Sequence, residues 1–212
     1  MKIIRPSIQI EYLTPNACEV IENAARTCYQ SHDITDSGSA ERLTKTLLKS
    51  GHHTPIEFCT MNLRFIIDRG ISHELVRHRV ASYCQESSRY CNYSKNKFGN
   101  ELTFIAPWWT TDNVLNYEAN LLTDAEEWFI QSCRTAEKDY LRLLTEIKPQ
   151  DARGCLPNWL KTEVKMHLNF REARLMLSQR TASGAHPDMR IIMTNLLGQL
   201  QRQEPIIFGG LL

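Results

Sequence analysis

The chain has 212 residues, 42% of them hydrophobic and 23% charged, with a formal net charge of +1. This composition is typical of a globular protein with one large domain or two small ones, and the near-zero charge argues against a general attraction to nucleic acid or membranes. No apolar run reaches the ~20 residues that span a bilayer, and the N-terminus lacks the apolar stretch of a signal peptide.

Hydrophobic periodicity and turn residues predict strands and helices in alternation. Thr14 and Pro15 are typical of a helix start, and Gly51 is typical of a helix end. Gly70 and Ser72 predict the end of a strand and the cap of a short helix. In chain order we expect a strand over 2–12, helices over 14–29 and 39–50, a strand over 57–67, a short helix from Ser72, and an aperiodic segment over 79–99.

The second half of the chain continues in the same way. We expect a strand over 102–106, helices over 112–147 with a break at Thr123-Asp124, a loop over 149–157, a strand over 163–170, and helices over 171–180 and 187–203. No repeat, low-complexity tract or linker interrupts these elements. The economical prediction is one α+β domain over residues 1–212.

The cysteines indicate the redox compartment. The chain has seven, an odd number, and none of them forms a C-x-x-C pair. This pattern argues against a disulfide framework and against a zinc site, and it predicts a cytoplasmic protein.

The segment from Glu74 to Tyr90, ELVRHRVASYCQESSRY, concentrates cationic and polar side chains. It holds three arginines (Arg77, Arg79 and Arg89) and three serines, and unpaired charges of this kind are costly to bury. Surface ion pairs or solubility would explain one or two of the arginines. The complete set predicts recognition of an anion, because guanidinium groups bind phosphate or carboxylate through two parallel hydrogen bonds.

Other reactive side chains near this segment support no simple alternative. Cys84 lies among cations that would stabilise a thiolate, but a free cysteine is more often a small buried hydrophobe, and the chain has seven. His78 lies between two arginines, which favours a neutral ring that stacks or hydrogen-bonds. His52, His53 and Glu57 lack further ligands at a usual spacing, so we expect no metal site.

A second group of polar residues lies far along the chain. It consists of Arg153, the run Asn169-Phe170-Arg171, and Arg180. The helix dipole alone would favour Arg174 and Arg180 near a helix C-terminus. It does not explain Arg153, which lies in a predicted loop.

Five segments, in order along the chain, resemble one known family, the flavin-dependent thymidylate synthases. Arg77-His78-Arg79, seven further residues and Ser87-Ser88-Arg89 resemble its signature R-H-R-x7-S-x-R. The stretch GHHTPIEF over 51–58 resembles the G-H-x-T-P-x-E segment, and Asn169-Phe170-Arg171 resembles the N-x-R flavin motif. Arg153 with Leu156-Pro157 resembles a nucleotide-contacting loop, and Arg180, Ala185 and Arg190 resemble the closing R-x4-A-x4-R segment.

The resemblance implies a fold, an assembly and a reaction. The fold would be an α+β domain with a mainly antiparallel sheet flanked by helices, and four identical chains would form a homotetramer with shared active sites. The reaction would convert dUMP to dTMP with 5,10-methylenetetrahydrofolate as carbon donor, NADPH as reductant and FAD as carrier. The cofactor supplies the chemistry in such an enzyme, so no protein nucleophile is required.

The resemblance also implies roles for residues of this sequence. Arg180 is the implied catalytic residue, because it would stabilise the ionised uracil ring electrostatically. The implied dUMP contacts are Glu74, Arg77, Gln85, Glu86, Ser87, Ser88, Arg89, Arg153 and Arg180. The implied FAD contacts are Thr54, Arg77, His78, Arg79, Asn169 and Arg171.

The chain departs from the common family pattern at several positions. Cys84-Gln85 stands where the signature usually has Asn-Glu, and Glu74 stands where many members have Gln. Leu175 replaces a usual flavin-contacting Asn or His, and His186-Pro187 replaces Gln and an aromatic residue. These changes retain the FAD and dUMP framework, but the folate contacts and the exact pyrimidine substrate do not follow from the sequence.

Three alternatives remain beside this hypothesis. One is a pyrimidine-nucleotide methyl- or hydroxymethyltransferase variant, which would transfer a hydroxymethyl group or act on another pyrimidine nucleotide. Another is a mechanism in which the Cys84 thiolate attacks the pyrimidine C6 atom. The third is a non-catalytic nucleic-acid-binding protein that stacks bases on Tyr83, Tyr90, Tyr93, Trp108 and Trp109, and the near-neutral charge counts against it.

Overall fold

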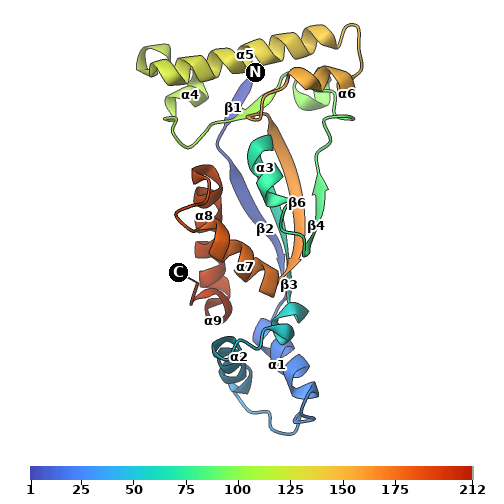
Figure 1. Ribbon diagram of the computed structural model, residues 1–212, viewed down its shortest axis with the longest axis vertical. Helices are drawn as coiled ribbons and strands as arrows, with labels where there is room; N and C mark the ends of the chain where they lie inside the picture. The colour runs from blue at the N-terminus through green and yellow to red at the C-terminus, as the bar shows by residue number, and fades with distance from the viewer. Residues whose placement is uncertain (212) are drawn as a thin grey trace. The chain divides into compact units, whose positions relative to one another are not determined.

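Strand pairing in the computed structural model, which describes residues 1–211, produces two sheets (Figure 1). In the smaller sheet, β1 (Lys2–Ile4) pairs in parallel with β5 (Thr103–Ile105), and Ile3 lies opposite Phe104. The larger sheet has the order β2-β3-β6-β4. Its strands are β2 (Ser7–Leu13), β3 (Thr60–Asp68), β6 (Lys161–Asn169) and β4 (Ala81–Gln85).

The two central strands of the larger sheet run antiparallel. The Phe170 amide, just after β6, donates to the Cys59 carbonyl, just before β3, at 2.8 Å. The Arg69 amide, just after β3, donates to the carbonyl of Asn158, which precedes β6, also at 2.8 Å. These contacts and the flanking helices confirm the predicted α+β class with an antiparallel sheet.

The helices agree with most of the predicted ranges. The α-helices are α1 (Ala17–Thr27), α2 (Ser39–Lys49), α3 (Arg69–Leu75), α4 (Asn113–Asn116), α5 (Asp124–Leu143), α6 (Pro149–Ala152), α7 (Phe170–Arg180), α8 (Pro187–Gln203) and α9 (Pro205–Phe208). Short 3-10 helices are η1 (Thr54–Phe58), η2 (Asn96–Phe98), η3 (Ala119–Leu121) and η4 (Arg153–Cys155). None of the helices within residues 1–211 has both the length and the apolar character needed to cross a bilayer.

Two predicted helix starts are wrong, the first because of a long-range partner and the second because of a cap four residues earlier. Thr14 does not cap α1, since its Oγ1 accepts a hydrogen bond from the Thr60 amide at 2.8 Å. Helix α1 begins after Asn16, which adopts a left-handed φ of 51°. The cap of α3 is Asp68, whose carboxylate accepts from the Ile71 amide at 2.8 Å, and the predicted cap Ser72 lies inside the helix.

Four other expectations also need correction. The opening strand over 2–12 is divided between the two sheets, with Arg5 and the donor-less Pro6 at the break. The strand predicted from Glu57 begins only at Thr60, because Thr54–Phe58 forms η1. The segment over 79–99, predicted to be aperiodic, contains β4, and the loop over 149–157 contains α6 and η4.

Two compact units make up the described chain, and each has its own buried core. Unit 1 comprises Met1–Ser7, Phe65–Arg77 and Cys84–Val164. Unit 2 comprises Ile8–Arg64, His78–Tyr83 and the residues from Lys165 onward. The units are described separately below.

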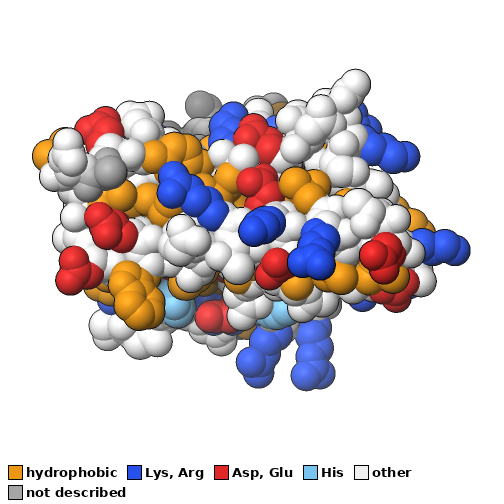
Figure 2. All heavy atoms as spheres, turned by 90° about the horizontal axis from the view of Figure 1, so that it is seen from above, with side chains coloured by type: hydrophobic (Ala, Val, Ile, Leu, Met, Phe, Trp, Pro, Cys, Tyr) orange, Lys and Arg blue, Asp and Glu red, His pale blue; other side chains and the backbone are white. Residues whose placement is uncertain are grey.

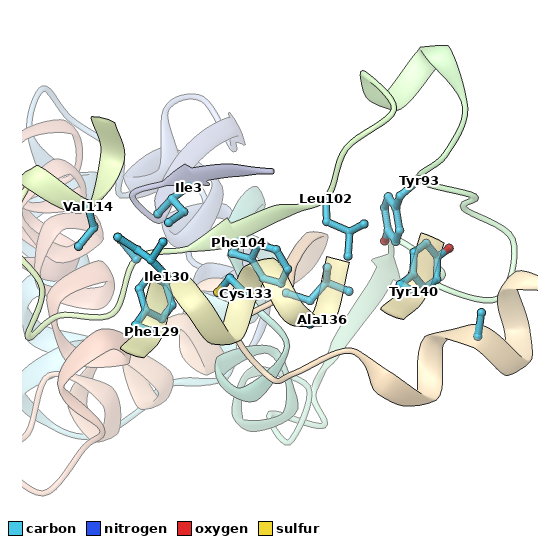
Figure 3. Close-up of a cluster of buried hydrophobic side chains, with 13 residues drawn as sticks. Ile3, Tyr93, Leu102, Phe104, Val114, Phe129, Ile130, Cys133, Ala136 and Tyr140 are labelled. Atoms are coloured by element: carbon cyan, nitrogen blue, oxygen red, sulfur yellow. The ribbon is translucent and has the colours of Figure 1, made fainter. Parts of the chain in front are cut away.

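The core of unit 1 lies along α5 (Figure 3). Its labelled members are Ile3, Tyr93, Leu102, Phe104, Val114, Phe129, Ile130, Cys133, Ala136 and Tyr140. At one end Phe129 meets Trp159 edge-to-face, with ring centroids 5.0 Å apart, and Trp109 at 6.1 Å. Aromatic pairs in this geometry add about 0.5–1.5 kcal/mol each to the gain from burial, so they help fix α5 in place.

The core of unit 2 is formed mainly by helices. Helix α1 packs against α2 and η1, and α7 packs against η1 and α8. Ile21, Ile56 and Leu196 are fully buried, and the rings of Phe170 and Phe208 meet edge-to-face with centroids 5.3 Å apart. Helix α7 therefore starts from a fixed position, which matters because it carries several of the predicted site residues.

Helix α5 begins with a capping box that also binds the preceding chain. Thr123 Oγ1 accepts from the Glu126 amide at 3.3 Å, and Glu126 Oε2 accepts from the Thr123 amide at 2.8 Å. Glu126 Oε1 accepts from the Thr111 amide at 2.5 Å. Hydrogen bonds from Thr123 and Thr111 lower the pKa of the buried Glu126 carboxyl from 4.5 to about 2. The ionised carboxylate therefore stabilises the folded chain.

We expect Glu126→Gln to lower the free energy of unfolding at neutral pH by about 1–3 kcal/mol. Because the folded-state pKa is lowered, this contribution is complete above pH 4.5 and is lost as the pH falls toward 2. Urea denaturation at pH 7 and near pH 3 should therefore show a smaller difference between variant and wild type at the acidic pH. Glu127→Gln, at the exposed neighbouring position, is the matched control. An equal loss in both variants would contradict the assignment.

Candidate functional site

In unit 1, two arginines converge on the hydroxyl of Ser88. Ser88 is buried, and its Oγ accepts hydrogen bonds from Arg69 Nη2 at 3.1 Å and Arg153 Nη1 at 3.2 Å. Among residues 1–211, neither guanidinium forms an ion pair with a carboxylate. Two uncompensated cations around one hydroxyl form a site suited to an anion such as a phosphate.

Arg69 is the residue that holds this arrangement together, and the sequence analysis missed it. It is the first residue of α3, and its guanidinium also donates to the Glu86 carbonyl and to Thr162 Oγ1, both at 3.1 Å. It thereby ties the chain after β4 to β6. A single arginine at a strand end, outside the cluster over 74–90, gives no spacing signal. The contact between Arg69 and Ser88 becomes visible only in the structure, where Arg69 begins α3 and its side chain reaches the Ser88 hydroxyl.

Glu86, a predicted dUMP contact, is already paired inside unit 1. Its Oε1 accepts from the Tyr93 hydroxyl at 2.8 Å, and its Oε2 accepts from Lys161 Nζ at 2.7 Å and from the Glu163 amide at 3.2 Å. Burial raises the pKa of Tyr93, and the Glu86 carboxylate raises it further, so the phenol remains a donor. The main role of Glu86 in this arrangement is to anchor the turn after β4.

The neighbouring predicted residues have varied surroundings. The Gln85 amide nitrogen donates to Ser72 Oγ at 2.9 Å and to Thr162 Oγ1 at 3.2 Å. The Ser87 carbonyl accepts from the Tyr90 and Cys91 amides and closes a turn. Arg89 is exposed and lies over the Tyr90 ring, 5.5 Å from its centroid.

The remaining unit 1 residues lie on or just after α3 and β4. Glu74 is half-buried on α3, and Arg77 is exposed just after it. The expectation that Cys84 is a small buried hydrophobe is wrong, because Cys84 is exposed near the end of β4. In unit 1 the structure thus brings Ser88 and Arg153 together with Arg69, and it leaves Arg77 and Arg89 open to solvent.

In unit 2, His78 links two side chains of α7. His78 Nδ1 lies 3.2 Å from Glu172 Oε1, and Arg180 Nε donates to His78 Nε2 at 3.0 Å. His78 and Glu172 are buried, and Arg180 is half-buried as the last residue of α7. Burial lowers the pKa of His78, the Arg180 charge lowers it further, and Glu172 opposes both. The ring is therefore neutral at pH 7, as predicted, but the causes are burial and Arg180, whereas the prediction was based on Arg77 and Arg79.

The start of α7 borders a cavity in unit 2. Asn169 caps the helix, with its Oδ1 accepting from the Glu172 amide at 2.8 Å. Arg171 pairs with Glu57 at 2.6 Å on the surface. The cavity has a volume of about 640 Å³, within the range of small-molecule sites. Its lining includes His53, Glu57, Val80, Asn169, Arg171 and Leu175.

Another cavity of unit 2 lies beside η1. It has a volume of about 440 Å³, and Thr54 and Arg171 line it together with Tyr29 and Leu47. Arg79 is exposed, and its side chain makes no hydrogen bond or ion pair within the described part of unit 2. Of the predicted flavin residues of unit 2, Thr54, Asn169 and Arg171 therefore line concave surfaces that offer cationic, amide and apolar groups.

Other kinds of site have less support among the described residues. No group of three or more His, Cys, Asp or Glu side chains within residues 1–211 is placed to hold a metal ion. Tyr90 and Trp108 are exposed, as a base-stacking surface requires. However, the face seen in Figure 2 carries acidic and basic side chains interspersed, whereas a nucleic-acid interface is typically a continuous basic patch.

Comparison with known proteins identifies the family. The sequence model described as "Thymidylate synthase complementing protein" matches residues 10–206. The chain belongs to this family. Its curated relatives include two flavin-dependent thymidylate synthases. The one from Clostridium tetani is 27% identical, over 94% of this chain and 83% of the relative. The one from Geobacter sulfurreducens is 28% identical, over 92% of this chain and 82% of the relative.

Solved structures support the fold of this family member. Thymidylate synthase X from Helicobacter pylori, solved with FAD and dUMP, matches with a TM-score of 0.74 and 23% identity over 96% of this chain and 97% of that chain. A UMP/dUMP methylase from Streptomyces cacaoi, bound with 5-Br dUMP, matches with a TM-score of 0.75 and 19% identity over 99% and 96%. At these identities the likeness supports a shared fold.

Proposed function

We propose that this chain is a flavin-dependent thymidylate synthase that converts dUMP to dTMP. The carbon donor would be 5,10-methylenetetrahydrofolate and the reductant NADPH, with FAD as cofactor. The observation that carries the proposal is the Ser88 hydroxyl between Arg69 and Arg153, because it offers an anion two cations and a small polar side chain. Membership of the family and the names of its curated relatives support the same reaction.

The residues of unit 2 fit a flavin dinucleotide. Arg171 and Asn169 offer donors of the kind that bind a diphosphate, and Val80 and Leu175 give the same cavity apolar walls for a ring system. From the family resemblance, we propose that Thr54, His78, Arg79, Asn169 and Arg171 of unit 2 hold FAD and that Arg77 of unit 1 is a further FAD contact. When bound, FAD would supply hydride transfer. The protein would contribute binding and orientation.

We propose that the nucleotide phosphate binds near Ser87, Ser88, Arg89 and Arg153. Glu74, Arg77 and Gln85 would add contacts to the sugar and base. Glu86 would act mainly by holding the turn, since Lys161 and Tyr93 already use its carboxylate. Arg180 would donate to the uracil ring where negative charge develops, an electrostatic role that requires a fixed guanidinium.

We further propose the setting in which the enzyme works. The chain would act as one functional domain over 1–212, which the family match over 10–206 supports. It would form a homotetramer with shared active sites, as the resemblance implies. The seven cysteines, all unpaired in the structure, are compatible with a reducing cytoplasm. Small-molecule nucleotide and folate substrates would be its partners, without nucleic acid or membrane.

A purified protein of this function should be yellow and should oxidise NADPH faster when dUMP is added. The absorption spectrum with and without dUMP, followed by analysis of the product, tests flavin and substrate together. A colourless protein that takes up no FAD would rule the proposal out. Cys84→Ala should retain full activity, whereas complete loss with FAD still bound would favour attack by the exposed thiol instead.

A second candidate substrate follows from the Cys84-Gln85 departure. Gln85 offers an amide where the common signature has a carboxylate, and its nitrogen already donates to Ser72 and Thr162. Contacts from Gln85 to a bound nucleotide would therefore differ from the common pattern, which leaves room for hydroxymethyl transfer or for another pyrimidine nucleotide as substrate. Parallel assays with dUMP and UMP, with identification of the products, separate the two.

A further inference from the structure

Two buried side chains and a half-buried one, on α7 and in the segment before β4, form a three-residue chain of contacts in unit 2. Glu172 lies in the first turn of α7, and Arg180 is the last residue of that helix. Between them, His78 uses Nδ1 toward Glu172 at 3.2 Å and Nε2 toward Arg180 at 3.0 Å. His78 and Glu172 are only 6% and 7% exposed, so water does not compete freely for these bonds.

We propose that His78, oriented by Glu172, is a positioning residue that holds the Arg180 guanidinium in place. The proposal rests on the proposed function, in which Arg180 contacts the uracil ring. In addition to any contact with flavin, His78 would position the Arg180 side chain.

The direction of the hydrogen bonds carries the proposal. An arginine has donors and no acceptor, so the contact with Arg180 Nε requires a lone pair on His78 Nε2. The ring proton must then be on Nδ1, where it is donated to the Glu172 carboxylate. A long, flexible side chain at a helix end is thereby fixed at its Nε atom. Loss of that contact would remove the hydrogen bond that fixes the guanidinium at Nε.

Protonation of His78 would abolish this arrangement. An imidazolium carries a proton on both nitrogens, so Nε2 would present a donor to the Arg180 donor, and two positive charges would meet. The groups facing His78 in unit 2 are Glu172 and Arg180 from α7 and Tyr83 from β4, whose hydroxyl donates to the His78 carbonyl at 2.7 Å. Burial raises the pKa of Tyr83 to about 12, so Tyr83 stays neutral.

The sign of the pH effect follows from these neighbours. Burial and Arg180 lower the pKa of His78, so the neutral, Arg180-accepting form persists below the ordinary value of 6.5. Glu172 raises the pKa of His78 through its charge and hydrogen bond, so Glu172→Gln should lower that pKa further. Removing the charge of Arg180, as in Arg180→Gln, should raise it.

Nuclear magnetic resonance of the His78 ring nitrogens tests the inference without an activity assay. We expect the Nδ1–H tautomer in the wild-type protein, and a His78 pKa that increases from Glu172→Gln through wild type to Arg180→Gln. An Nε2–H tautomer, or one pKa shared by all three proteins, would overturn it. This readout remains informative if the protein forms no dTMP, in which case only the proposed function fails.

The pH dependence of kcat gives the second test. We expect activity to fall on the acidic side as His78 protonates, and this acidic limb should move to lower pH in Glu172→Gln. His78→Ala should reduce kcat by about 10–100-fold, the order expected when a catalytic group is misplaced. In His78→Gln the amide oxygen can accept a hydrogen bond from Arg180 at any pH, because the amide does not take up a proton in this range. The acidic limb of the kcat profile should therefore disappear in this variant.

A matched control separates this effect from general damage. His32→Gln, at an exposed position of unit 2, should leave the acidic limb in place. An active enzyme whose limb stays fixed in Glu172→Gln and His78→Gln would overturn the inference and leave the proposed function standing. Glu172→Gln has nearly the same shape as the wild-type residue, so the test does not depend on the fold surviving His78→Ala.

Discussion

Arg180→Lys should lower kcat for dTMP formation by about 10²–10³-fold, the loss typical when one fixed donor to a developing negative charge is removed. Lysine keeps the positive charge but has no Nε–H group. It therefore loses the 3.0 Å contact with His78 and the planar guanidinium that this contact orients. Because catalysis depends on donors that are already in position, a mobile ammonium at the same place should be a poor substitute.

Single-turnover measurement of dTMP formation is the appropriate assay, with flavin content and dUMP affinity measured on the same samples. The loss should appear in the chemical step while FAD is retained. Arg202→Lys, at an exposed position in the last turn of α8, is the matched control and should behave as wild type. Wild-type kcat in Arg180→Lys would remove Arg180 from the mechanism.

Arg69→Met should raise KM for dUMP by about 10–100-fold, because a charge-assisted hydrogen bond contributes about 1.5–3 kcal/mol. The substitution removes the donor to Ser88 and the two donors that tie the Glu86 carbonyl to Thr162. Arg69→Lys should fall between wild type and Arg69→Met, since it keeps the charge and loses the fork. The expected loss lies mainly in nucleotide binding.

Deoxyuridine, which lacks the phosphate, shows whether the loss concerns the anion. Its weak binding should be the same in wild type and Arg69→Met, whereas dUMP should bind more weakly to the variant. Arg142→Gln, at an exposed position of α5, is the control in the same unit. An equal effect on both ligands would mean that Arg69 stabilises unit 1 without serving the phosphate.

Local sequence patterns predicted the helices and strands that are determined by residues close together in the sequence. Helix α5 followed from its apolar positions and from the predicted break at Thr123-Asp124, and β3 followed from strict alternation. Thr14 was misassigned because its partner, the Thr60 amide, lies 46 residues away. Strand β4 was missed because its alternation, half-buried and exposed, is short and polar.

The residues of the candidate site also fall into those that the sequence predicted and those that only the structure revealed. Arg153, Ser88, Arg180 and His78 were found from motifs. Arg69, which binds Ser88, and Glu172, which binds His78, were not. Glu172 lies 94 residues from His78, and Arg69 lies 19 residues from Ser88 with no motif between them. Sequence patterns identify which residue types gather along the chain. The partners that orient them become visible only when separate strands and helices are placed together.

The aromatic group around Phe129 has a consequence for following the folding of this protein. All four tryptophans, Trp108, Trp109, Trp128 and Trp159, belong to unit 1, and two of them touch Phe129. Intrinsic tryptophan emission during denaturation is therefore a reporter for unit 1. Circular dichroism, which senses the helices of both units, would complement it. Coincident transitions by the two methods would mean that the units unfold as one cooperative body, and separated transitions would give each unit its own stability.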